Sequence, residues 1–365
     1  MTESIYEKLA RRLAAMEMGL PYKEEVVEIL RANFSESEAG VAILLPVEGS
    51  PFDAVSAAEI ATGSHLSPES LTPILERLAA RGLVFSKRDA SGEVRFALHR
   101  AGYGFFQTFF WKGEDTPHAR NMSRLVLKYF DRKVTTEVFG GLQTKPYRYI
   151  PVDRSLRPEI QAVLPSFRME VVIDGAHTFA VAHCPCRVQA GLMGRACSHP
   201  TEVCIKFDEL GSYLIERGLA REISRAEARD IIAKSAKAGL VHFVDNAAGK
   251  AKHNCNCCGC ACWNVGNIRR RKIPRDVLMA VYFLRETDPD RCTGCGECVE
   301  VCPVKAVGIE DGLAVVDKDW CIGCGVCATR CELEAITLEP RPGRPSLPAD
   351  FDELHQTIRA ERHSQ

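Results

Sequence analysis

The cysteines of this chain are confined to its second half, where they fall into dense groups. Of the 17 cysteines in 365 residues, none precedes Cys184. The N-terminal segment 1–8 is charged and no apolar stretch follows it, so we expect no secretory signal and a cytoplasmic location. In a reducing compartment, clustered thiols indicate metal binding or catalysis rather than disulfides. The groups are Cys184, Cys186, Cys197 and Cys204; then Cys255, Cys257, Cys258, Cys260 and Cys262; then eight from Cys292 to Cys331.

Charge divides the chain into parts of opposite sign. Residues 1–100 carry a net charge of −4, residues 101–270 carry +8, and the remainder carries −5. The overall charge of −1 gives no general attraction to nucleic acid or to an anionic membrane. The longest apolar run, 41–47, is too short to span a bilayer, so we expect no membrane insertion. We expect an α+β multidomain protein with modules over 1–100, 101–270 and 276–340, then a proline-rich linker and a helix over 341–365.

The last cysteine group has the most specific spacing. Residues 292–303 read C-x2-C-x2-C-x3-C-P, and residues 321–331 repeat the same cysteine spacing 29 positions later. On these motifs the segment 284–340 resembles the bacterial two-[4Fe–4S] ferredoxin family. The resemblance implies two clusters, with the fourth cysteine of each motif binding the other cluster. It assigns Cys292, Cys295, Cys298 and Cys331 to one cluster, and Cys302, Cys321, Cys324 and Cys327 to the other.

Two details of this segment bear on its fold and its metal. The Asp311-Gly312 pair predicts a tight hairpin turn between the two halves. Glu332 stands where the family usually has proline, which alters the turn after the last cysteine but removes no ligand. Structural zinc is the alternative, but zinc sites usually pair two C-x2-C turns without a third step. The spacing therefore favours iron–sulfur clusters.

The nine cysteines between residues 184 and 262 have no standard spacing. They allow one or two further iron–sulfur clusters, with zinc as the alternative. In the simplest assignment, the first four cysteines bind one cluster and four of the five in 255–262 bind another. In a rival assignment, both groups surround a single cluster and leave spare thiols for a substrate.

Polar residues beside these cysteines are candidates for catalysis. His183 and Arg187 flank the first two cysteines, and His253 precedes the second group. If the middle segment reduces a substrate, these residues would donate a proton or bind an anion. Hydrogen bonding around the thiolates is favoured over metal ligation for His183, His199 and His253. The CPCR…CNCCxC pattern ahead of a ferredoxin segment resembles iron–sulfur proteins of anaerobic bacteria and archaea, which supports metal binding.

The N-terminal segment reads as helices followed by a two-stranded wing. Over residues 20–100 this order resembles the winged-helix superfamily. The last helix begins with Ser67, Pro68 and Glu69, which lack the basic or amide side chains that contact base edges. We therefore expect a protein-docking module rather than a DNA-binding one. Helices are expected over 23–33, 36–45, 55–62 and 67–82, and the two strands within 83–98.

Further elements are expected around the middle cysteines. Segments 169–174 and 178–182 are predicted as a hairpin-like pair that leads into Cys184. Segment 224–239 is predicted as a capped helix, and 350–362 as another helix. The aromatic run 103–111 is predicted to pack where the first two modules meet, rather than to hold a flavin or a quinone.

The motifs that the sequence lacks narrow its function. There is no Walker A loop, no G-x-G-x-x-G after a strand, no radical-SAM cysteine triad and no HExxH. We predict an iron–sulfur protein of an anaerobic bacterium that passes single electrons between a redox partner and a larger oxidoreductase subunit. One alternative is a reductase whose substrate binds at the middle cluster. The other is a redox-sensing DNA-binding regulator.

Overall fold

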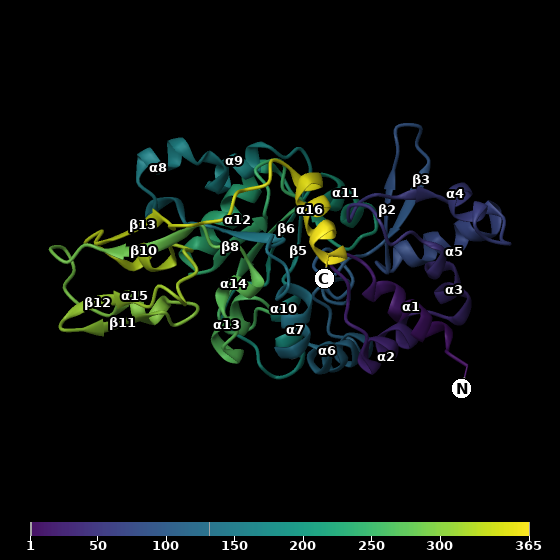
Figure 1. The fold of residues 1–365 in the computed structure, drawn as a ribbon, viewed down its shortest axis with the longest axis horizontal. Coiled ribbons are helices and arrows are strands. Elements are labelled where there is room, and N and C mark those ends of the chain that lie inside the picture. The colour runs from purple at the N-terminus through teal and green to yellow at the C-terminus, as the bar shows by residue number, and fades with distance from the viewer. Residues whose placement is uncertain (1, 131, 365) are drawn as a thin grey trace.

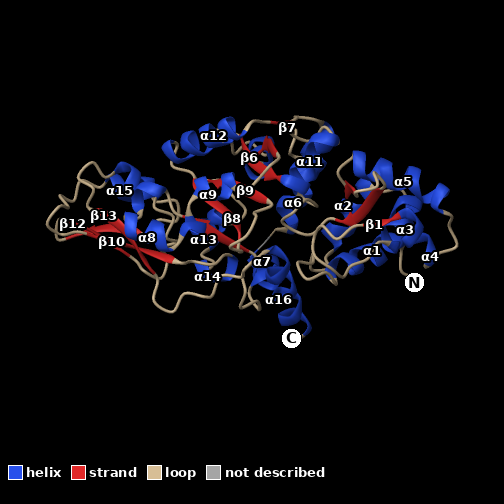
Figure 2. Cartoon of the chain, turned by 90° about the horizontal axis from the view of Figure 1, so that it is seen from above, coloured by secondary structure: helices blue, strands red, loops and turns tan. Residues whose placement is uncertain are grey.

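The computed structural model describes residues 2–130 and 132–364. The molecule is elongated, with three parts in a row (Figure 1). The N-terminal helices lie at one end, the strands near the C-terminus lie at the other, and a larger sheet lies between them (Figure 2). The cysteine-bearing segments therefore occupy the middle and one end of the molecule.

The N-terminal module combines helices with a small antiparallel sheet in the order β1-β3-β2. Helices α2, α3 and α5 lie within two residues of their predicted bounds, but segment 55–62 begins as a short strand. Helix α1 has no counterpart among the predictions. The elements are α1 (Ile5–Ala14), α2 (Glu24–Asn33), α3 (Glu36–Leu44), β1 (Val55–Ser56), α4 (Ala57–Thr62), α5 (Pro68–Ala80), β2 (Val84–Arg88) and β3 (Val94–Leu98).

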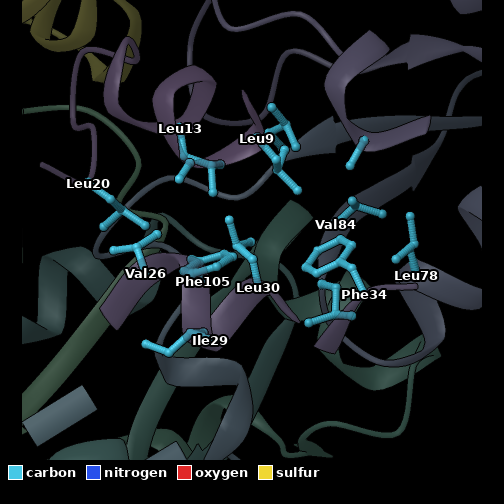
Figure 3. Packing of buried hydrophobic residues seen from close by; sticks show 14 of the residues in the cluster. Leu9, Leu13, Leu20, Val26, Ile29, Leu30, Phe34, Leu78, Val84 and Phe105 are labelled. Carbon is cyan, nitrogen blue, oxygen red and sulfur yellow. The ribbon is translucent and has the colours of Figure 1, made fainter. Parts of the chain in front are cut away.

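Capping and burial explain these helices. Ser35 and Ser56 cap α3 and α4, each in a reciprocal pair with the glutamate three residues later. Leu9 of α1, Leu30 of α2 and Leu78 of α5 are almost fully buried in one core, and Figure 3 shows their side chains among the buried residues that fill it. The amphipathic faces thus hold the module together.

An aromatic segment joins this module to the next one. Phe106 and Phe110 are each 1% exposed, and Trp111 is equally buried. Phe130 stacks on Trp263 with ring centroids 5.3 Å apart. Two helices follow the segment, α6 (Pro117–Tyr129) and α7 (Arg132–Phe139). The run 103–111 thus packs between the modules, as predicted.

The middle module is built on a six-stranded antiparallel sheet in the order β4-β8-β9-β6-β5-β7. The strands are β4 (Tyr147–Ile150), β5 (Phe179–His183), β6 (Glu202–Phe207), β7 (Arg221–Glu222), β8 (Val241–Asp245) and β9 (His253–Cys257). Its helices are α8 (Pro158–Val163), α9 (Met169–Asp174), α10 (Pro185–Leu192), α11 (Asp208–Glu216), α12 (Arg225–Lys237), α13 (Val265–Arg271) and α14 (Arg275–Leu278).

One local prediction in this module is wrong. Segment 169–174 is helix α9 and not a strand, and β5 pairs with β6 instead. Met169 and Ile173, four residues apart, are both buried, whereas Val171 is 39% exposed. Burial on one side only, at helical spacing, selects a helix over the strand that the β-branched residues favour locally.

The C-terminal module has two small two-stranded sheets, of which β11–β12 is a hairpin. Strands β10 (Phe283–Thr287) and β13 (Ile336–Pro340) pair, as do β11 (Val307–Glu310) and β12 (Leu313–Val316), with α15 (Glu297–Val301) beside them. The predicted turn is present, because Asp311 has φ 48° and Gly312 has φ 77°. Positive φ at both central positions is the geometry that Asp-Gly favours.

Helix α16 (Phe351–His363) returns to the other two modules, close to its predicted bounds. Asp350 caps it, and its buried Leu354 and Ile358 pack with residues of the middle module. Arg362 donates to the carbonyl of Glu17, 3.0 Å away. The helix therefore fastens the N-terminal module to the sheet. Within the described residues, no helix is both long and apolar enough to cross a membrane.

Candidate metal centres

The C-terminal module places its eight cysteines around two cavities. These are the two sets that the ferredoxin resemblance implies, each with one cysteine from the other motif. One cavity is lined by Cys292, Cys295, Cys298 and Cys331. The other is lined by Cys302, Cys321, Cys324 and Cys327.

The surroundings of these thiols suit anionic sulfur. Backbone N–H groups of Ala306 and Ala335 donate to the sulfur atoms of Cys302 and Cys331 at 3.2 and 3.3 Å. Arg285, only 1% exposed, donates through Nη2 to Cys298 Sγ at 3.5 Å. Arg285 also lines both cavities. Donors and a buried positive charge stabilise thiolates that bind an iron–sulfur cluster, so the residues present fit such clusters.

The nine middle cysteines separate into two sets that cut across the sequence groups. The simplest sequence assignment is therefore corrected, because each set takes thiols from both groups. The first, which we name the six-thiol set, lines one cavity and consists of Cys184, Cys186, Cys204, Cys255, Cys257 and Cys262. The second, which we name the thiol–imidazole set, consists of Cys197, His199, Cys258 and Cys260.

Strand pairing explains half of the six-thiol set. Residues 253, 255 and 257 share one face of β9 because side chains alternate along a strand. Ile205 of β6 pairs with Asn254 of β9, which puts Cys204 beside Cys255. Their sulfur atoms lie 3.9 Å apart. The sheet thus gathers Cys204, Cys255 and Cys257 on one face.

The beginning of α10 and the loop after β9 complete the set. Cys184 is the N-cap of α10, and Cys186 lies in its first turn. The positive end of a helix dipole lowers the cost of thiolate charge. The N–H of Trp263 donates to Cys186 Sγ at 3.4 Å, and that of Asn264 donates to Cys262 Sγ at 3.3 Å.

The six thiols form a continuous chain of side-chain contacts. A hydrogen bond with Cys186 is the main cause that lowers the pKa of both Cys184 and Cys262. A hydrogen bond with Cys204 does the same for the pKa of Cys255. The same contacts raise the pKa of the partner thiols Cys186, Cys204 and Cys257, so the six thiols titrate as one connected group. In order of contact they are Cys184, Cys186, Cys262, Cys257, Cys255 and Cys204.

Buried cations face the same thiols. Lys206 is 3% exposed. Burial lowers its pKa, but the neighbouring Cys204 and Cys255 raise it by more, so the net pKa of Lys206 lies above the usual value. His253 is 2% exposed; burial opposes its charge, but Asp245, with Oδ1 3.0 Å from Nδ1, raises the pKa of His253 to about 9. These charges offset part of the negative charge of a thiolate-bound centre.

The three catalytic candidates have different surroundings. His253 interacts with Cys255, and Arg187 lies among the thiols of Cys184, Cys257 and Cys258. His183 lies instead beside the hydroxyl of Thr201, with Nδ1 3.2 Å from Oγ1. The structure therefore brings His253 and Arg187 to the sulfur sets and leaves His183 outside them.

His199 is a site residue that the sequence did not favour as a metal ligand. Its Nδ1 lies 3.7 Å from Cys260 Sγ. The signal that could have identified it is the matching spacing of Cys197-x-His199 and Cys258-x-Cys260, which supplies two ligand pairs.

Both middle sets lie against the ferredoxin module, the thiol–imidazole set through Gly259, between Cys258 and Cys260, and the six-thiol set through Tyr149. A Cβ at Gly259 would overlap the carbonyl oxygen of Pro303, the residue after Cys302, so the two backbones are in contact. Tyr149 is 2% exposed, and burial raises the pKa of its hydroxyl well above the usual range, with contributions from Cys262 and Cys324. Its ring therefore lies between the two modules' thiols.

Comparisons with known proteins agree with the C-terminal geometry. Residues 285–332 match the family described as 4Fe-4S dicluster domain. A stretch of 28 residues, 8% of this chain, is 57% identical to Ferredoxin-2 of Desulfomicrobium norvegicum and covers 48% of that protein. Stretches of the same length are 61% identical to Ferredoxin-3 of Desulfocurvibacter africanus and to Ferredoxin-1 of Nitratidesulfovibrio vulgaris, covering 46% and 45% of them. The chain spans about half the length of the curated relatives it matches. Its C-terminal module is a ferredoxin-like 4Fe–4S domain.

Proposed function

We propose that this protein transfers single electrons between a redox partner and a larger oxidoreductase subunit, through the ferredoxin domain and the six-thiol set. In this proposal the two cysteine quartets of the ferredoxin domain bind one [4Fe–4S] cluster each. The six-thiol set binds a further iron–sulfur centre. Such clusters supply one-electron redox chemistry at potentials that the protein sets through charge, hydrogen bonds and burial.

The observation that carries the proposal is that thiols of the six-thiol set and of the second ferredoxin site share one buried cluster. Cys257 and Cys262 belong to it together with Cys302 and Cys324, and Tyr149 interacts with thiols of both modules. The N–H of Val152 donates to the carbonyl of Cys324 at 3.1 Å, so the middle module also covers the second cluster site. A structural metal site would need no such position, whereas a redox centre needs a near neighbour.

The outer end of the ferredoxin domain suits a basic partner. Cys295 is exposed there, and so is Leu333, which is 47% exposed. A positively charged partner surface would be attracted to this acidic end, which speeds association. We place the exchange of electrons with the redox partner here. The exposed acidic residues around it are Asp288, Asp290, Glu297, Glu300, Glu332 and Glu334.

In the proposal the N-terminal module is a winged helix that docks a protein. Its helix order and its β1-β3-β2 sheet support that fold. Two of the three basic side chains of its wing are paired, Lys87 at 3.7 Å from Glu209 and Arg95 with Glu59 at 2.5 Å, whereas Arg88 is exposed. Phosphate binding requires available cations, so the module favours docking over DNA regulation.

Metal analysis and EPR of the anaerobically reconstituted chain test the proposal. Two ferredoxin clusters account for about eight irons. We expect more than that, with a reducible EPR signal beyond those of the ferredoxin domain. Cys257→Ser should remove this extra signal, whereas the control His183→Ala, at a residue outside both thiol sets, should leave it. About eight irons with zinc at the six-thiol set would contradict the proposal.

A reductase is the second candidate, and one observation favours it. Six thiols line one cavity, whereas a [4Fe–4S] cluster needs four cysteine ligands. The aromatic side chains of Phe106, Phe130 and Trp263 line the same cavity. Spare thiols and an apolar wall would suit a substrate. Repeated turnover of a small molecule by the isolated chain would support this function, whereas reoxidation by a protein partner alone would not.

A further inference from the structure

The thiol–imidazole set is geometrically separate from the six-thiol set. Its four ligand atoms, three sulfurs and one imidazole nitrogen, all lie within 4.8 Å of one another. Cys197 and His199 come from the loop between α10 and β6, and Cys258 and Cys260 come from the loop after β9. The sulfur atoms of Cys197 and Cys258 lie 4.0 Å apart and those of Cys204 and Cys255 lie 3.9 Å apart, so each of these contacts joins members of one set.

We propose that Cys197, His199, Cys258 and Cys260 bind one tetrahedral zinc ion. Metal–sulfur bonds of about 2.3 Å in a tetrahedron put two sulfurs about 3.8 Å apart, and a sulfur and an imidazole nitrogen about 3.6 Å apart. The structure has Cys197 Sγ 4.0 Å from Cys258 Sγ, and Cys260 Sγ 3.7 Å from His199 Nδ1. These spacings fit ligands of a single shared ion.

The donor chemistry selects zinc. Three soft thiolates and an imidazole leave no oxygen for a hard cation such as magnesium or calcium. A closed set of four protein ligands is typical of structural zinc, with no position open for substrate. Three thiolates on a divalent ion leave one negative charge, and the buried guanidinium of Arg187, which interacts with Cys258, lies beside it.

The ion would hold together the loop between α10 and β6 and the loop after β9, which carries Cys262 of the six-thiol set. The N–H of Ala261 donates to Cys258 Sγ at 3.4 Å, which orients that thiolate. Cys257 and Cys262 of the six-thiol set flank the loop that the zinc would fix. The site is therefore a positioning element for the neighbouring centre and not a redox centre itself.

Zinc K-edge absorption spectroscopy of the full reconstituted chain tests the ligand set without any substitution. We expect one zinc per chain, with three sulfur ligands near about 2.3 Å and one nitrogen near about 2.0–2.1 Å. Absence of zinc, or a zinc site with four sulfurs or with oxygen ligands, would overturn the proposal. Zinc bound also at the six-thiol set would raise the zinc content above one per chain and add sulfur ligands to the averaged spectrum, so failure of the proposed function is distinguishable from failure of this assignment.

Variants at His199 extend the test. His199→Ala should lower the zinc content to well under one per chain after mild chelation. His199→Cys should keep the zinc and change the visible spectrum of the cobalt-substituted chain from that of three sulfurs and one nitrogen to that of four sulfurs. The matched control His183→Ala, beside Thr201, should keep the zinc and the spectrum of the parent chain. Zinc retained at one per chain in His199→Ala would overturn the assignment. So would the loss of about four irons per chain instead of the zinc, because that loss would indicate an iron–sulfur cluster at this site.

Discussion

Arg285 offers the sharpest test of how the protein sets its potentials. It is buried between the two ferredoxin cavities, with Nη2 3.5 Å from Cys298 Sγ. Two unit charges at 3.5 Å with an effective dielectric constant of about 20 interact by about 5 kcal/mol, which is an upper limit. An added electron is spread over the cluster, and at about twice that distance the interaction is about 2.4 kcal/mol.

Arg285→Leu should therefore lower the reduction potential, because it removes a charge that favours the reduced state. For a one-electron couple, about 2.4 kcal/mol corresponds to about 100 mV. The cluster site lined by Cys298 should show the larger shift. An anaerobic redox titration followed by EPR measures both potentials, and iron content confirms that both clusters are present.

Arg285→Lys is the control that keeps the positive charge. Its potentials should stay within about 20–30 mV of the parent chain. A shift of less than about 20 mV in both clusters of Arg285→Leu would refute the electrostatic reasoning. So would an upward shift, or an equal shift in the lysine variant.

Three other outcomes are expected. Gly259→Ala should slow electron transfer between the modules, measured by rapid-freeze EPR, because its Cβ would overlap the Pro303 carbonyl; unchanged transfer would contradict the proposed route. Asp245→Asn should cost about 3–5 kcal/mol in chemical unfolding, because it leaves the buried His253 charge unpaired; a loss below about 1 kcal/mol would mean that this charge is not held there. Deleting residues 349–365 should cost about 5 kcal/mol and speed proteolysis between the first two modules, because helix α16 buries several apolar side chains; unchanged proteolysis would deny its fastening role.

Local patterns predicted much of the fold. The Asp311-Gly312 turn and helices α2, α3 and α5 follow from turn chemistry, caps and apolar spacing, which act within a few residues. The prediction for segment 169–174 is wrong because burial of Met169 and Ile173 against distant residues, and not local propensity, decides that the segment forms a helix. Propensity in a short segment yields to such tertiary contacts.

The same contrast holds at the candidate sites. The two ferredoxin quartets could be predicted because a repeated motif carries the pairing. The middle sets could not, because Cys204 meets Cys255 only through the pairing of β6 with β9, across 51 positions of the chain. The alternation of His253, Cys255 and Cys257 does predict a shared face. The alternation does not indicate which strand pairs with β9, and therefore which cysteine lies beside Cys255.

Helix α16 has a consequence for the order in which the protein matures. It follows the ferredoxin domain in the chain, yet its Phe351 stacks on Phe52 and its Arg362 binds the carbonyl of Glu17. On the ribosome, the N-terminal module therefore emerges long before the helix that fastens it to the sheet. Every cysteine has been synthesised by the time that helix docks. The attachment of the N-terminal module to the sheet is therefore completed only after every cysteine-bearing segment is available to fold.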